Sequence, residues 1–72
     1  MLSDVADRVF KELQGEGYEP RMHEPKEDGG PFSITLRGNE FDIDDFKTMV
    51  RIAEDFGVPL GLDENGWIRL GG

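Results

Sequence analysis

The regular spacing of its apolar residues constrains what this chain can fold into more than any other feature. These residues occur singly or in short runs, which excludes a membrane-spanning helix and favours amphipathic elements around one core. The chain has 72 residues and no cysteine, so neither disulfides nor thiolate zinc sites can stabilise it. Packing alone must hold the fold together, and we predict a single domain that covers residues 1–72.

Residues 2–14 are predicted to form an amphipathic helix. Ser3 is a suitable N-cap, and Gly15 is placed to end the helix. The apolar positions follow the i, i+3, i+4, i+7 spacing of one helical face. They are Leu2, Val5, Ala6, Val9, Phe10 and Leu13.

A second helix is predicted between Asp42 and Gly57. Asp42 is the expected N-cap, and Asp45 three positions later resembles the second half of a capping box. Gly57 and Val58 have the spacing of a Schellman motif, and Pro59 prevents continuation of the helix. The expected buried stripe consists of Ile43, Phe46, Met49, Val50, Ala53 and Phe56.

Four short strands are predicted in the remaining segments. They cover residues 18–23, 32–37, 58–62 and 67–70, and the clearest alternation of apolar and polar residues is that of 32–37. Asn65-Gly66 indicates a hairpin turn between the last two strands. The element order is α-β-β-α-β-β, which predicts an α+β fold with a mainly antiparallel four-stranded sheet and two helices packed on one face.

No arrangement of residues indicates catalysis. His23 is the one histidine, and Ser3 and Ser33 are the two serines. A nucleophile needs an adjacent base that a third group orients, and neither the order nor the spacing of these residues indicates such a set. We therefore expect a non-enzyme with no catalytic residues and no cofactor.

Metal binding is not expected either. Residues 63–68 resemble the middle of an EF-hand loop, but Gly61 and Gly72 stand where its first aspartate and its bidentate glutamate belong. The acids around Asp42 suit the positive end of a helix dipole.

The charge is the main functional clue. Sixteen acidic residues stand against eight basic ones, a formal net charge of −8. Such a chain repels nucleic acid and anionic membranes and attracts basic surfaces. Glu12, Glu16, Glu54 and Asp55 lie near predicted helix C-termini, where the dipole disfavours anions, so local stability does not explain them.

We therefore predict a small, acidic, non-catalytic protein of the cytoplasm that docks on a basic surface of a partner protein. One form of this function is a nucleic-acid mimic that occupies a nucleic-acid-binding complex, in the manner of phage-borne inhibitors of restriction or CRISPR systems. No direct binding of nucleic acid or membrane is expected. The residues predicted to contact the partner are Glu40, Asp42, Asp44, Asp45, Glu54, Asp55 and Trp67.

Two alternatives remain open. The C-terminal Gly71-Gly72 resembles the di-glycine of ubiquitin-like modifiers and sulfur carriers, and the order β-β-α-β-β resembles that of their β-grasp fold; this resemblance implies a carrier or modifier. In the other alternative the acidic surface serves solubility in a salt-rich cytoplasm and has no partner.

Overall fold

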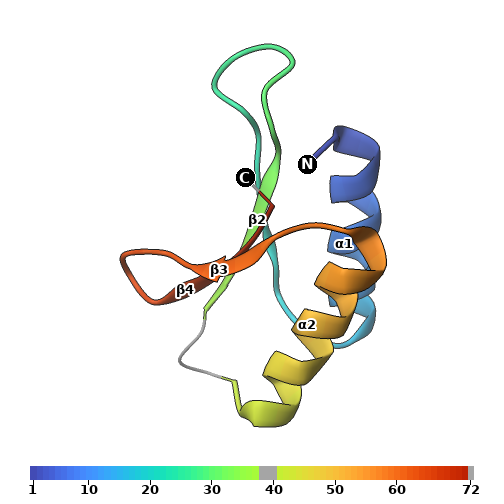
Figure 1. Cartoon of the computed structure of the whole chain (residues 1–72), viewed down its shortest axis with the longest axis vertical. Helices are drawn as coiled ribbons and strands as arrows, with labels where there is room; N and C mark the ends of the chain where they lie inside the picture. The colour runs from blue at the N-terminus through green and yellow to red at the C-terminus, as the bar shows by residue number, and fades with distance from the viewer. Residues whose placement is uncertain (38–40, 72) are drawn as a thin grey trace.

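The computed structural model describes residues 1–37 and 41–71 and contains two helices and four strands (Figure 1). In chain order they are α1 (Ser3–Gly15), β1 (Arg21–His23), β2 (Ser33–Arg37), α2 (Ile43–Phe56), β3 (Leu60–Leu62) and β4 (Trp67–Gly71). The predicted order α-β-β-α-β-β is confirmed, and each predicted strand matches one observed strand.

The strands form one antiparallel sheet in the order β1-β2-β4-β3. The longest ladder joins β2 to β4, where Ile34 lies opposite Leu70 and Leu36 lies opposite Ile68. Both helices lie side by side on one face of this sheet, and no other described helix or strand covers the opposite face, called the open face below (Figure 1). The predicted α+β architecture with both helices on one face is therefore confirmed.

The core lies between the helices and the central strands. The largest fully buried side chains are Val9, Leu13, Ile34, Leu36, Met49, Ile52, Ile68 and Leu70. The buried stripe of α2 differs from the predicted one. Ile52 is 1% exposed, whereas Ile43 and Val50 are 71% and 42% exposed. The helix is rotated so that Met49, Ile52, Ala53 and Phe56 face the sheet, and Ile43 and Val50, seven residues apart, share a solvent-facing side.

The ends of α2 follow the predicted capping motifs. The Asp42 carboxylate accepts the Asp45 N–H at 3.0 Å, and the Asp45 carboxylate accepts the Asp42 N–H at 3.1 Å, which completes a capping box. At the other end Gly57 has the left-handed φ of 66°, and the Val58 N–H donates to the Ala53 carbonyl at 2.9 Å. This bond is the six-to-one contact of a Schellman motif.

The ends of α1 differ from the prediction by one or two residues. The Leu2 carbonyl accepts the Ala6 N–H at 2.9 Å, so Leu2 is the N-cap, and Ser3 begins the helix and provides no side-chain cap. At the C-terminus, the Tyr18 N–H donates to the Leu13 carbonyl at 3.1 Å. This six-to-one bond places Gly17, rather than Gly15, at the position that ends the helix.

The β3–β4 hairpin turns through residues 63–66. Asp63 organises this turn, because its Oδ1 accepts the N–H groups of Asn65 and Trp67, each at 2.9 Å. The Gly66 N–H also donates to the Asp63 carbonyl at 3.1 Å. The segment that resembled an EF-hand loop is thus a hairpin turn.

Within the part of the chain that the structure describes, neither helix has the length and apolar character needed to cross a membrane.

Candidate functional site

The acidic residues predicted to bind a partner lie at the two ends of α2. Asp42, Asp44 and Asp45 surround its N-terminus, and Glu54 and Asp55 lie in its last turn. Asp44 and Glu54 are ten positions apart, which corresponds to about 15 Å along the helix axis. Glu40, which was predicted to belong to the same surface, lies outside the described residues. The structure therefore separates the described acids into two groups on one helix.

Part of the N-terminal group has a structural role. Asp42 and Asp45 hold the capping box, and Asp45 Oδ1 also accepts the Tyr18 hydroxyl at 3.0 Å. Tyr18 in turn packs edge-on against Phe41, with ring centroids 5.2 Å apart. These contacts join the segment after α1 to the start of α2. Asp44 is the one described acid of this group whose carboxylate forms no hydrogen bond or ion pair with a described residue.

The environment of Tyr18 predicts a pH dependence. Burial, and next the hydrogen bond to Asp45, raise the pKa of Tyr18 above its ordinary value of 10.0. A raised pKa in the folded state means that the folded protein holds this proton more tightly than the unfolded chain. The stabilisation is therefore fully present below pH 10.0 and is lost as pH rises through the higher folded-state pKa.

Tyr18 is the one tyrosine of the chain, so the absorbance of tyrosinate in an alkaline titration reports its ionisation alone. We expect a midpoint above 10.0 in the folded protein. Asp45→Asn should move that midpoint down by part of the shift, because burial remains as the larger cause. A wild-type midpoint at or below the value of the unfolded chain in denaturant would contradict this assignment.

The acids at the C-terminus of α2 are exposed and only weakly paired. Arg51 lies 4.0 Å from Asp55 and 3.4 Å from Glu16, so one guanidinium serves two carboxylates. The Glu54 carboxylate forms no ion pair or hydrogen bond with any described residue. Exposed pairs of this kind contribute little to stability.

Trp67, the aromatic residue predicted to bind the partner, lies on the opposite side of the molecule. In β4 the side chains of Ile68 and Leu70 are buried under the helices, so Trp67 and Arg69 point to the open face of the sheet. Strand register adds neighbours to them: Arg37 lies opposite Trp67, and Thr35 lies between Arg69 and Arg21. The four strands contain no aspartate or glutamate.

The open face therefore has the reverse charge of the whole chain. It carries three of the eight basic residues and the one histidine, and its central aromatic residue is the one tryptophan. We call this surface the arginine face, defined by Arg21, His23, Thr35, Arg37, Trp67 and Arg69.

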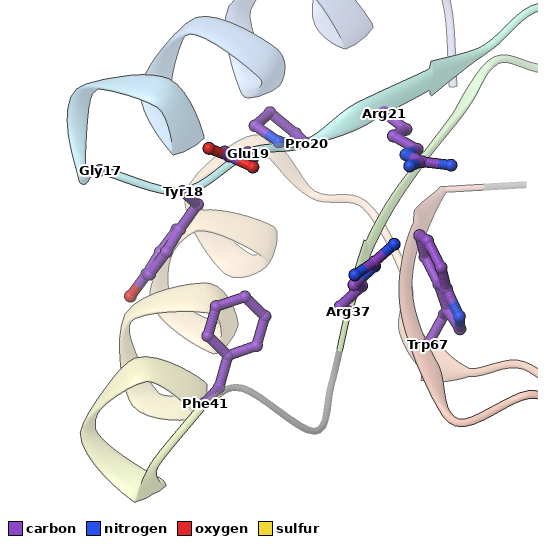
Figure 2. A pocket seen from close by; sticks show the side chains of 8 residues that line it. All are labelled: Gly17, Tyr18, Glu19, Pro20, Arg21, Arg37, Phe41 and Trp67. Carbon is purple, nitrogen blue, oxygen red and sulfur yellow. The ribbon is translucent and has the colours of Figure 1, made fainter.

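Trp67 is the centre of the arginine face. The guanidinium carbons of Arg21 and Arg37 lie 5.2 and 5.5 Å from its ring centroid, within the range of cation–π contacts. Figure 2 shows both arginine side chains extending toward the indole, with Tyr18 and Phe41 at the far end of a shared cavity. This cavity has a volume of about 530 Å³, and Gly17, Glu19 and Pro20 complete its lining.

His23 belongs to a smaller hollow of about 200 Å³ on the other side of Trp67, which Arg69 and Asp63 also line. Its Nε2 lies 2.7 Å from the Thr35 hydroxyl, and Thr35 is only 4% exposed. Among the described residues, no group of three or more His, Asp and Glu side chains is arranged to hold a metal ion. The arginine face presents the guanidinium N–H donors of its arginines, the indole ring of Trp67 and the hydroxyl–imidazole pair of Thr35 and His23. Groups of these kinds are typical of a ligand-binding surface.

The residues of the arginine face, apart from Trp67, were not among the predicted site residues. Alternation within residues 67–70 already places Trp67 and Arg69 on one side of a strand, and Arg37 ends an alternating strand. The missing information was the register, which brings side chains of β1, β2 and β4 together.

Comparison with protein-family models, curated proteins and solved structures found no match to this chain.

Proposed function

We propose that this chain is a small, acidic, non-catalytic protein that docks on a basic surface of a partner protein through the solvent-facing side of α2. The observation that carries this proposal is the exposure of Ile43 and Val50 next to unpaired or weakly paired acids. Ile43, Val50 and Glu54 follow one line along the helix, because they are spaced by seven and four residues. Asp44 and Asp55, eleven residues apart, follow an adjacent line.

This combination supports docking over a surface kept for solubility. Charged side chains alone keep a small protein soluble, and exposed large apolar side chains work against solubility. A patch with apolar residues at its centre and charged residues around it is typical of a protein interface. Of the predicted contact residues, the proposal keeps Asp44, Glu54 and Asp55 and adds Ile43 and Val50.

The partner that we propose is a nucleic-acid-binding complex of the cytoplasm, whose basic channel the acidic side of α2 occupies as a nucleic-acid mimic. Such channels carry the positive charge that attracts carboxylates as well as phosphates. An inhibitor of the phage anti-restriction or anti-CRISPR type is the corresponding biological class.

Charge reversal at the end of α2 tests this proposal. In affinity capture from a lysate of the source organism, we expect Glu54→Lys/Asp55→Lys to reduce recovery of the partner about tenfold or more, because rim charges govern encounter and salt dependence. The variant should fold at least as well as the wild type, since cations suit a helix C-terminus. Glu24→Lys/Glu27→Lys, which makes the same change of charge in the β1–β2 loop, is the matched control.

Equal recovery with the α2 variant and the wild type would overturn the proposed surface. Val50→Ser tests the apolar part, and it should weaken capture without altering its dependence on salt. If no partner is recovered and the isolated protein is stable only in molar salt, the solubility alternative replaces the proposal.

The alternative function, that of a ubiquitin-like modifier or sulfur carrier, remains a prediction and depends on Gly71 and Gly72. Gly71 is the last residue of β4 and its N–H donates to the Pro59 carbonyl at 2.8 Å, so it belongs to the sheet. Gly72 lies outside the described residues. Deletion of both glycines should abolish a carrier function and leave docking through α2 intact.

A further inference from the structure

We propose that the cavity at one end of the arginine face, where the ends of α1 and α2 meet the sheet, is a second binding site, and that it takes a nucleotide unit: a planar base with an exocyclic amino group, joined to a phosphate. The site goes beyond the function proposed above and does not use the acidic side of α2. Three features of the cavity between Trp67 and the Tyr18–Phe41 pair select this ligand.

The first feature is the positive charge that Arg21 brings to the cavity. Arg21 forms no hydrogen bond or ion pair with any described residue, and its one recorded contact is with the indole of Trp67. A guanidinium that lies against an aromatic ring keeps its N–H donors available in its own plane. Those donors match the oxygen atoms of a phosphate, which guanidinium binds through two parallel hydrogen bonds.

The second feature is the aromatic lining. Trp67, Tyr18 and Phe41 all border the cavity, and its volume of about 530 Å³ lies in the range of small-molecule sites and is large enough for one nucleotide. Bases of single strands and of free nucleotides stack on aromatic rings and on guanidinium planes. Trp67 can therefore stack on the base while Arg21 binds the phosphate.

The third feature is the carboxylate of Glu19, a described residue that lines the same cavity. A carboxylate repels a second phosphate but accepts a hydrogen bond from an exocyclic amino group, as in the recognition of cytosine by acidic side chains. The net charge of −8 opposes a long polyanion in the same way. A single nucleotide unit with an amino-bearing base satisfies all three features.

The chain has one tryptophan, so the indole N–H resonance in a proton–nitrogen NMR spectrum comes from Trp67 alone and reports on binding beside it. Titration with CMP should shift this resonance in a saturable way. Cytidine lacks the phosphate, inorganic phosphate lacks the base, and UMP lacks the amino group. Each should therefore bind at least about tenfold more weakly than CMP. A short cytidine oligonucleotide distinguishes a free nucleotide from a nucleotide within a strand. If the oligonucleotide binds more tightly than CMP, the natural ligand is part of a strand; if the two bind equally, it is a free nucleotide.

Arg21→Gln should weaken CMP binding about tenfold or more, because it removes a charged donor to the phosphate. Arg21 is exposed, so the variant should fold normally, as far-UV circular dichroism can verify. Arg8→Gln, which makes the same charge change on the exposed side of α1, is the matched control and should bind CMP like the wild type. Glu54→Lys/Asp55→Lys should also bind CMP like the wild type, which separates this site from the docking surface.

Four results would overturn the proposal. Millimolar CMP could cause no saturable shift, or Arg21→Gln could leave the affinity for CMP unchanged. Inorganic phosphate or cytidine could bind as tightly as CMP, or UMP could bind as tightly as CMP. The last result would remove Glu19 as the group that selects the base.

Discussion

Ile52→Ala is expected to lower the free energy of unfolding by about 2–5 kcal/mol. Ile52 is 1% exposed and belongs to the core cluster that also contains Leu13, Leu36 and Met49. Alanine keeps the helix propensity of α2, so the expected loss comes from the removed apolar contacts and from the cavity that remains. A domain of 72 residues has roughly 4–11 kcal/mol of stability in total. This one substitution can therefore bring the protein close to unfolding.

Val50→Ala is the matched control, because Val50 lies two residues away in the same helix and is 42% exposed. Its effect should stay within about 0.5 kcal/mol, as is usual for surface positions. Urea unfolding followed by circular dichroism measures both variants. Equal losses for Ile52→Ala and Val50→Ala would show that the rotation of α2 described above is wrong, and would restore the stripe expected from the sequence.

Gly71→Ala is expected to lower the free energy of unfolding by about 1–3 kcal/mol. Gly71 has a φ of 81°, a left-handed conformation that residues with a Cβ rarely adopt. An added Cβ would also lie 3.0 Å from the backbone carbonyl oxygen of Phe32. That oxygen cannot easily move, because it accepts a hydrogen bond of 2.9 Å from the N-terminal ammonium group of Met1.

Gly61→Ala provides the comparison within the same sheet. A Cβ at Gly61 would meet no atom within 4 Å, and its φ lies outside the left-handed region. Alanine there should leave the stability unchanged or raise it by about 0.4–1 kcal/mol, since it restricts the unfolded chain. Thermal and urea unfolding of the two variants decide the matter. If Gly71→Ala were as harmless as Gly61→Ala, the end of β4 would not be held as described, and a free di-glycine tail would regain support.

The elements of this protein could be predicted because their determinants lie within a few residues of one another. Asp42 and Asp45 exchange backbone hydrogen bonds three positions apart, and Gly57 with Val58 ends α2 through contacts within the last turn and a half. The turn after β3 likewise depends on Asp63 and the residues that follow it. The start of α1 was misplaced by one residue because Ser3, although suited to a cap, forms no capping hydrogen bond.

The rotation of α2 could not be predicted with the same accuracy. Its apolar residues cover about half of the helix circumference, because Ile43 and Val50 extend the stripe on one side and Ile52 extends it on the other. Only packing against α1 and the sheet decides that Ile52 is buried and that Ile43 and Val50 face solvent. The docking surface proposed for α2 depends on this choice.

Sequence alone determined the order of the elements, the capping of α2, the last hairpin and a net charge that repels polyanions. Only the tertiary structure decided how that charge is distributed. Arg21, Arg37 and Trp67 come from three different strands, and they meet because β2 pairs with both β1 and β4 in one register. The physical reason is that helices, caps and tight turns depend on neighbouring residues, whereas strand order depends on burying one shared core. An arginine-rich face on an acidic protein becomes visible only when that pairing is known.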